Sequence, residues 1–199
     1  MAGRDYEKTR DEIREAALRV LRERGPEGTT LETVAESLGY TKPALYYYFK
    51  SKEELLSSLV LRELTEALVG IREIGDRDGP ARDKLRALIR LYLDEHFRSR
   101  GYSSILHEMR SFRERLPPGP ERDEIRRLSQ EIPKRIVGIM RQGIESGEFR
   151  KEDPRVLGGI LFAMLSGVLA HLEQPILSGA DADRIRASLE EILIKGIAP

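Results

Sequence analysis

The sequence contains no cysteine, no tryptophan and no asparagine among its 199 residues. The absence of cysteine excludes disulfide bonds and thiolate metal sites, and it is compatible with a reducing compartment. No apolar run approaches the roughly 18 residues that a membrane-spanning helix requires. The first residues, MAGRDYEKTRDEIREAA, are charged throughout and lack the apolar core of a secretory signal. We therefore expect a cytoplasmic protein that does not enter a membrane.

The sequence signatures of common enzyme classes are also missing. The chain has no HExxH, no GxSxG and no phosphate-binding P-loop. None of its histidines, His96, His107 and His171, follows a glutamate by three positions, which excludes the Glu-x-x-His pairs of di-iron bundles. We expect no catalytic residue, no metal site and no cofactor, and we interpret these histidines as ordinary polar or core residues. A helical dimer with a purely structural or protein-binding role remains an alternative.

Charge is balanced over the whole chain but unevenly placed along it. The chain has 34 basic and 34 acidic residues and a net charge of +0, whereas proteins that bind nucleic acid often carry a basic surplus. The segment from Ser37 to Lys52 nevertheless contains three lysines and five aromatic residues, and it contains no acid. If DNA is the partner, this segment is where a local positive charge would meet the phosphates.

Hydrophobic periodicity predicts an all-α protein with about nine helices and no strand. The first helix is expected to end at Gly25-Pro26, because glycine and proline interrupt a helical pattern. Thr29 is expected to cap a short second helix, with Glu32 three residues later completing a capping box. Gly39 then ends this helix in the left-handed conformation that glycine adopts easily.

The same signals predict the remaining boundaries. A third short helix begins at Thr41, where Pro43 is tolerated in the first turn. Ser51 caps a long fourth helix that runs to about Gly75, with Glu54 as its capping-box partner. A later long helix ends near Ser146 and contains Pro133, where we expect a kink. The other predicted helices are Ala81–Ser99, Ser103–Glu114, Pro154–Leu172 and Ala182–Gly196.

Two short helices joined by a glycine turn and braced by a preceding helix form a helix-turn-helix. In that motif the second short helix enters the major groove of DNA. Helical spacing from Thr41 to Phe49 turns Leu45, Tyr48 and Phe49 inward. The alternative is that every ring belongs to the core and that the lysines are only solvated. The face expected to meet DNA carries Lys42, Pro43, Ala44, Tyr46 and Tyr47, with Lys52 nearby.

Residues 9–56 resemble the N-terminal domain of the TetR family of bacterial regulators. The resemblance lies in 30-TLETVAESLGYTKPALYYYFKSKEELL-56. Tyr40 departs from a commoner valine, and Pro43-Ala44 departs from a frequent Gly-Thr or Gly-Ser. The resemblance implies a helix-turn-helix domain at residues 1–51 and a ligand-binding and dimerisation domain at residues 52–199. It also implies DNA contacts by Thr41, Lys42, Ala44, Tyr46 and Tyr47, with Thr30 and Lys52 on the DNA backbone.

The last two predicted helices are expected to form a dimer interface. Apolar residues cover Pro154–Leu172 too widely for one buried face, and its small residues permit close approach of another helix. TetR-like proteins build a four-helix interface from their last two long helices, so we expect a homodimer through Pro154–Leu172 and Ala182–Gly196. A two-fold dimer requires a near-palindromic operator in double-stranded DNA. The alternative is a helix buried inside one monomer.

The fourth to eighth predicted helices are expected to enclose a site for a small-molecule effector. Residues 141–161 are similar to TetR members that sense fatty-acyl or related coenzyme A thioesters, which implies an effector with an apolar part and an anionic part. Arg110 and Arg113 have the spacing to hold a phosphate or carboxylate, or else they lie on a solvated face beside Glu108 and Glu114. By linkage, such an effector would release a repressor from DNA. The predicted lining residues are Leu88, Tyr92, Leu106, Met109, Arg110, Phe112, Arg113, Ile136, Met140 and Phe162.

Overall fold

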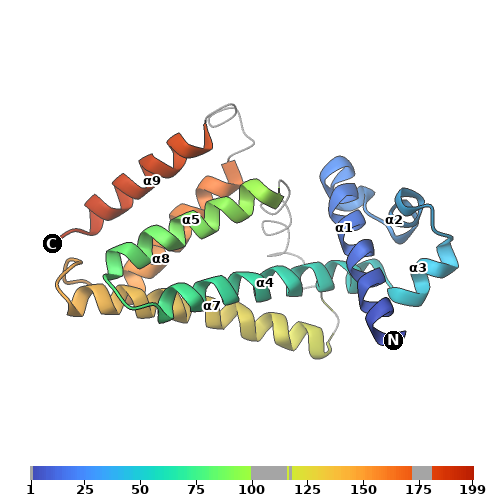
Figure 1. The fold of residues 1–199 in the computed structure, drawn as a ribbon, viewed down its shortest axis with the longest axis horizontal. Helices are drawn as coiled ribbons and strands as arrows, with labels where there is room; N and C mark the ends of the chain where they lie inside the picture. The colour runs from blue at the N-terminus through green and yellow to red at the C-terminus, as the bar shows by residue number, and fades with distance from the viewer. Residues whose placement is uncertain (1, 100–115, 117, 172–180) are drawn as a thin grey trace. The chain divides into compact units, whose positions relative to one another are not determined.

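The computed structural model describes residues 2–99, 116, 118–171 and 181–199, and every regular element within these residues is a helix (Figure 1). The all-α prediction is confirmed, while the helix expected at Ser103–Glu114 lies outside the described residues. None of the described helices combines the length and apolar character needed to cross a membrane. The helices are α1 (Ala2–Gly28), α2 (Leu31–Leu38), α3 (Lys42–Tyr48), α4 (Lys52–Asp76), α5 (Ala81–Ser99), α7 (Pro120–Glu145), α8 (Pro154–His171) and α9 (Ala182–Ile197).

The chain folds into two compact units. One unit consists of Met1–Glu63 and Ile105–Ile125, and the other consists of Leu64–Ser104 and Arg126–Pro199. Helices α4 and α7 therefore each contribute residues to both units, and α7 continues through Pro133. The predicted functional division between residues 51 and 52 stays a prediction.

The cap of α2 differs by one residue from the sequence prediction. The hydroxyl of Thr30 accepts the N–H of Thr33 at 3.1 Å, and the hydroxyl of Thr33 accepts the N–H of Thr30 at 2.9 Å. The predicted pair of Thr29 and Glu32 was wrong, because Thr29 is buried and donates its hydroxyl to the carbonyl of Gly25 at 2.8 Å. Gly25 leaves the helical conformation at φ 66° and ψ 179°, which interrupts α1 where expected. Glu32 is therefore not the partner in the capping box.

The turn between α2 and α3 and the starts of α3 and α4 follow the predicted capping residues. Gly39 adopts a left-handed conformation at φ 67° and ends α2. The hydroxyl of Thr41 accepts the N–H three residues later at 3.4 Å, which caps α3. Ser51 accepts the N–H of Glu54 at 3.2 Å, which caps α4. A capping box would also have the carboxylate of Glu54 accept the N–H of Ser51. Instead, this carboxylate accepts the N–H of Lys50, the preceding residue, at 2.7 Å.

The second unit is held by an apolar core and by a polar clamp at the start of α5. Glu148, in the loop after α7, accepts the N–H groups of Ala81 and Arg82, each at 3.0 Å. Partial burial opposes the ionised form, but these donors outweigh it, so the pKa of Glu148 lies below its ordinary value. Lys84 is buried and donates to the Gly75 carbonyl at 2.9 Å. The core of this unit includes Leu85, Leu88, Ile89, Leu93, Ile136, Met140, Phe149, Leu157, Leu161, Leu165, Leu189 and Leu193.

Candidate DNA-binding surface and effector region

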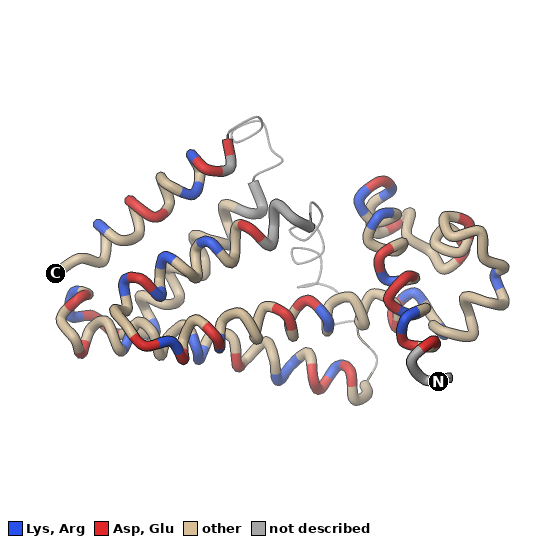
Figure 2. The backbone as a smooth tube through the Cα atoms, in the orientation of Figure 1, with Lys and Arg blue, Asp and Glu red and all other residues tan. Residues whose placement is uncertain are grey.

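The short helix α3 divides into a buried face and an exposed face. Leu45 and Phe49, the residue that follows the helix, are fully buried at 0% exposure, and Tyr48 is half-buried. Tyr47 is 64% exposed, although a large ring usually gains from burial. Figure 2 shows that α3 itself carries basic and uncharged residues with no acid among them. The exposed residues are Thr41, Lys42, Pro43, Ala44, Tyr46 and Tyr47, which is the predicted DNA-facing set of this helix.

Helix α1 contributes two side chains that sequence reasoning missed. The ring of Tyr6 lies 5.8 Å from that of Tyr47 at 83°, and 5.1 Å from that of Tyr48. The guanidinium of Arg10 lies 4.6 Å from the centre of the Phe49 ring. The contact with Tyr6 supports the exposed Tyr47 from one side. The helical period gave a signal for them, because Arg10 and Tyr6 extend the buried stripe backwards from Ile13.

A carboxylate from α2 lies beside the exposed face of α3. The Oε1 atom of Glu32 is 2.5 Å from Lys42 Nζ and accepts the hydroxyl of Tyr46 at 3.4 Å. Lys42 Nζ also lies 5.9 Å from the centre of the Tyr46 ring. The hydrogen bond from Lys42 lowers the pKa of Glu32, and the same bond raises the pKa of Lys42. The segment that lacks acids in the sequence therefore has an acid against it in space.

The other two lysines of the segment also bond within the protein. The amino group of Lys50 donates to the carbonyls of Tyr46 at 2.9 Å and Tyr47 at 3.3 Å, at the C-terminal end of α3. The amino group of Lys52 donates to the carbonyl of Pro26, which fastens the start of α4 to the end of α1. The half-buried Lys52 is thus a structural residue as well as a predicted phosphate contact. Thr30, the other predicted backbone contact, has its hydroxyl in the α2 cap.

The structure describes half of the residues predicted to line the effector site. Leu88, Ile136 and Met140 are buried in the second unit. Tyr92 is half-buried, and its ring lies 6.4 Å from that of Phe162, which is 41% exposed. The predicted residues outside the described part of the chain are Leu106, Met109, Arg110, Phe112 and Arg113.

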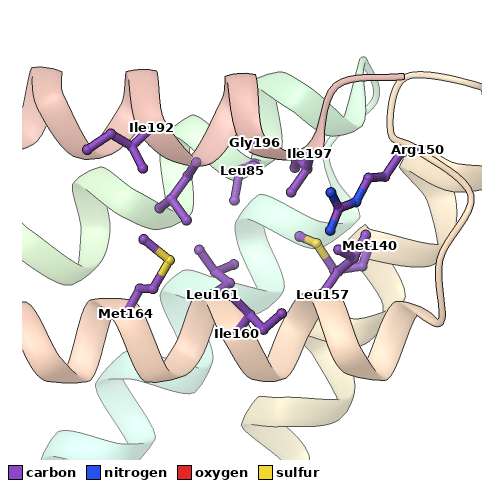
Figure 3. A pocket seen from close by; sticks show the side chains of 11 residues that line it. Leu85, Met140, Arg150, Leu157, Ile160, Leu161, Met164, Ile192, Gly196 and Ile197 are labelled. Carbon is purple, nitrogen blue, oxygen red and sulfur yellow. The ribbon is translucent and has the colours of Figure 1, made fainter.

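A pocket of about 180 Å³ opens between α8 and α9 (Figure 3). Leu161 and Met164 extend from α8 toward α9, and Arg150 is the charged member of an otherwise apolar lining. The rim residues Ile160 and Ile192 are 48% and 58% exposed. Sites for drug-sized ligands occupy roughly 300–1,000 Å³, so this pocket is too small for a long effector. It shares Met140 with the predicted effector lining.

Two family profiles match this chain. The profile of the bacterial regulatory proteins of the tetR family matches residues 13–59, which include α2 and α3. The profile of the tetracyclin repressor-like C-terminal domain matches residues 78–170. The chain belongs to the TetR family. It is therefore a DNA-binding transcriptional regulator with a helix-turn-helix domain and not an enzyme, as the sequence predicted.

Individual TetR-family relatives agree with this assignment over most of the chain. The HTH-type transcriptional repressor KstR2 of Mycolicibacterium smegmatis is 29% identical over 144 residues, which cover 72% of this chain and 68% of the relative. The HTH-type transcriptional regulator TtgR of Pseudomonas putida is 29% identical over 177 residues, which cover 83% and 80%. The structure of FadR from Bacillus subtilis in complex with stearoyl-CoA matches with a TM-score of 0.69 at 24% identity, over 93% of this chain and 97% of that chain. This last likeness shows a common fold.

Proposed function

We propose that this TetR-family protein is a cytoplasmic, dimeric repressor that a small hydrophobic or amphipathic effector releases from a near-palindromic operator. The observation that carries the proposal is the exposed face of α3 above the fully buried Leu45 and Phe49. A short helix anchored on one face presents its other face at a fixed orientation, which base recognition requires. Repression is supported by the relative KstR2, which is a repressor.

In this proposal α3 lies in the major groove and its flanks hold the DNA backbone. A tyrosine ring can pack on a sugar or a thymine methyl group while its hydroxyl bonds to a phosphate. Tyr47 suits this role because it is exposed and also braced by Tyr6. Thr30 and Lys52 contact the backbone at the edges of this surface. The residues proposed to face the groove are Thr41, Lys42, Pro43, Ala44, Tyr46 and Tyr47.

The dimer is proposed to form through α8 and α9. Val156, Ile160 and Ile192 on these helices are 46%, 48% and 58% exposed, which is costly for a lone chain. The small pocket between the two helices fits an apolar side chain from a second copy better than it fits a long ligand. A two-fold interface of this kind pairs the two DNA-binding units and so selects a near-palindromic operator.

The effector is proposed to have a long apolar part and an anionic part, as an acyl-CoA does. Leu88, Ile136 and Met140 are buried apolar residues of the second unit that would contact the apolar part, and Arg110 and Arg113 would hold the anionic group. The FadR structure with stearoyl-CoA supports this chemical class. Helix α4 contains residues of both units, so a change in the second unit can alter the spacing of the DNA-binding units. Titration calorimetry with a series of CoA thioesters tests the class, and the absence of binding to all of them would exclude it.

In vitro selection of random duplex DNA on the purified protein tests the DNA-binding proposal. At near-physiological salt we expect enrichment of a palindrome whose half-sites are centred about 34–36 Å apart, or a multiple of that distance. A purely structural helical dimer would enrich no sequence. If nothing is enriched, the selection is repeated with protein refolded free of ligand, because a bound effector also abolishes DNA binding. A second failure would contradict the assignment of the Lys42–Tyr47 face to base recognition.

A further inference from the structure

We propose that Glu32 is a specificity-determining residue that suppresses binding to non-cognate DNA by holding Lys42 on the protein. The inference rests on the proposed role of α3 as the recognition helix. Glu32 lies on α2, outside the set predicted to meet DNA, yet one of its oxygens binds the first residue of α3 and the hydroxyl of Tyr46. Both donors belong to the proposed DNA-facing set.

The physical reason lies in what binds DNA without regard to sequence. Non-cognate binding depends on cations that neutralise phosphates, and each neutralised phosphate releases counterions. Lys42 is paired with Glu32, so this lysine reaches a phosphate only if it leaves a carboxylate behind. That carboxylate would then face the DNA anion with its cation removed, which is unfavourable. Glu32 therefore lowers the affinity that the protein has for every sequence.

A cognate site can overcome this pairing because the pair is accessible to water. The side chains of Lys42 and Glu32 are 60% and 40% exposed, so the ion pair is weak and can exchange its partners. A guanine edge offers Lys42 two acceptors in fixed positions, which replace the carboxylate that the lysine leaves. Random DNA offers these groups only by chance. The exchange thus favours sequences whose base edges replace the partner that Lys42 gives up.

The test compares Glu32→Gln with Glu36→Gln, which removes the same charge one turn further along α2. Glu36 is exposed and lies outside the proposed binding surface. Binding is measured by fluorescence anisotropy across a salt series, with the selected duplex and with a scrambled duplex of equal length. Because Lys42 gains one phosphate contact, E32Q should bind the scrambled duplex about fivefold more tightly near 0.15 M salt, with a slope steeper by about 0.9. The affinity of E32Q for the selected duplex should rise less, so the ratio of its affinity for the selected duplex to that for the scrambled duplex should fall.

A double variant separates this role from simple removal of a negative charge. In the Lys42→Met background, Glu32→Gln should raise the affinity for the scrambled duplex no more than E36Q raises it in the wild type. Three results would overturn the proposal: equal effects of E32Q and E36Q, weaker binding of E32Q to both duplexes, or loss of binding to the selected duplex alone. The second would make Glu32 a scaffold residue, and the third would make it a direct base contact. Failure of the wild type to prefer its selected duplex would instead contradict the proposed function.

Discussion

Replacing Gly143 with alanine should destabilise the second unit even though alanine is the better helix former. Gly143 lies near the end of α7 and faces the ring of Phe149, which is 2% exposed. A Cβ added at Gly143 would lie 2.1 Å, 2.3 Å and 2.7 Å from three atoms of that ring. The ring cannot withdraw easily, because the N–H of Phe149 donates to the carbonyl of Gly143 at 2.9 Å.

Two opposing effects decide the sign of this change. Alanine is more favourable than glycine inside a helix by about 1 kcal/mol. Overpacking a filled core costs about 1–3 kcal/mol, and expelling a buried phenylalanine costs about 3–5 kcal/mol. A contact of 2.1 Å is too close to be relieved by small shifts, so the cost lies at or above the upper end of the overpacking range. The free energy of unfolding should therefore fall by about 2–4 kcal/mol.

Gly138→Ala is the matched control on the same helix. A Cβ at Gly138 meets nothing within 4 Å, and the position is exposed, so only the propensity gain of about 0.5–1 kcal/mol remains. Thermal unfolding followed by circular dichroism should show a lower Tm for G143A, by about 4–16 °C, and a slightly higher Tm for G138A. Protein concentration is kept fixed, because the Tm of a dimer depends on it.

The outcome that refutes the reasoning is a G143A protein as stable as G138A, since the clash would then not exist. The variant Phe149→Ala provides a second check. Removing the ring should be less costly in the G143A background than in the wild type, because the added methyl group then has room. Additive effects of the two changes would show that Gly143 and Phe149 do not act on each other.

Three other changes test the binding surface, the interface and the clamp on α5. Tyr47→Ala should weaken binding to the selected duplex about tenfold, while sedimentation shows an intact dimer; unchanged affinity would remove Tyr47 from the recognition face. Ile192→Asp should yield monomers in sedimentation equilibrium because it places an unpaired charge in the proposed interface, whereas Val69→Asp, 50% exposed on α4, should remain dimeric. Glu148→Gln should lower stability in urea by about 1 kcal/mol at pH 7. The pKa of Glu148 is lowered by folding, so this difference should be complete above the unfolded pKa of about 4.3 and vanish as pH falls through the folded value; a difference that persists in acid would contradict the clamp.

Helix boundaries could be predicted wherever a local signal sets them. The predicted and observed bounds of the helix at Ala81–Ser99 are identical, and Gly39 and Thr41 terminate or cap the helices as expected. The prediction of the α2 cap was wrong because two adjacent threonines offer equivalent hydroxyl groups. The choice between Thr29 and Thr30 depends on the carbonyl that the kink at Gly25 presents to the first of them. That carbonyl is positioned by the fold of α1 and not by the sequence around the cap.

The division of α3 into two faces could also be predicted, because it depends only on the helical period. The period placed Leu45 and Phe49 inside and Tyr47 outside. The support that Tyr6 gives to Tyr47 joins residues that are 41 positions apart, and sequence spacing within α3 contains no information about it. The exposed apolar residues of α8 agree with a pattern too wide for one buried face, since Leu157 is buried while Val156 and Ile160 remain exposed.

The lysines of the acid-free segment show how a count along the sequence differs from a charge in space. Lys42 is paired with Glu32, and Lys50 and Lys52 donate to backbone carbonyls. Lys42 must therefore leave the carboxylate of Glu32 before it can neutralise a phosphate, whereas Lys50 and Lys52 bond to neutral carbonyls and keep their charge. The contribution of Lys42 to DNA affinity is the difference between two paired states and not the full gain of a free cation. We accordingly expect the salt dependence of non-cognate binding by the wild type to be shallower than the slope of about 0.9 per phosphate for three lysines per protomer. A slope that matched all three lysines would mean that the Lys42–Glu32 pair exchanges without cost.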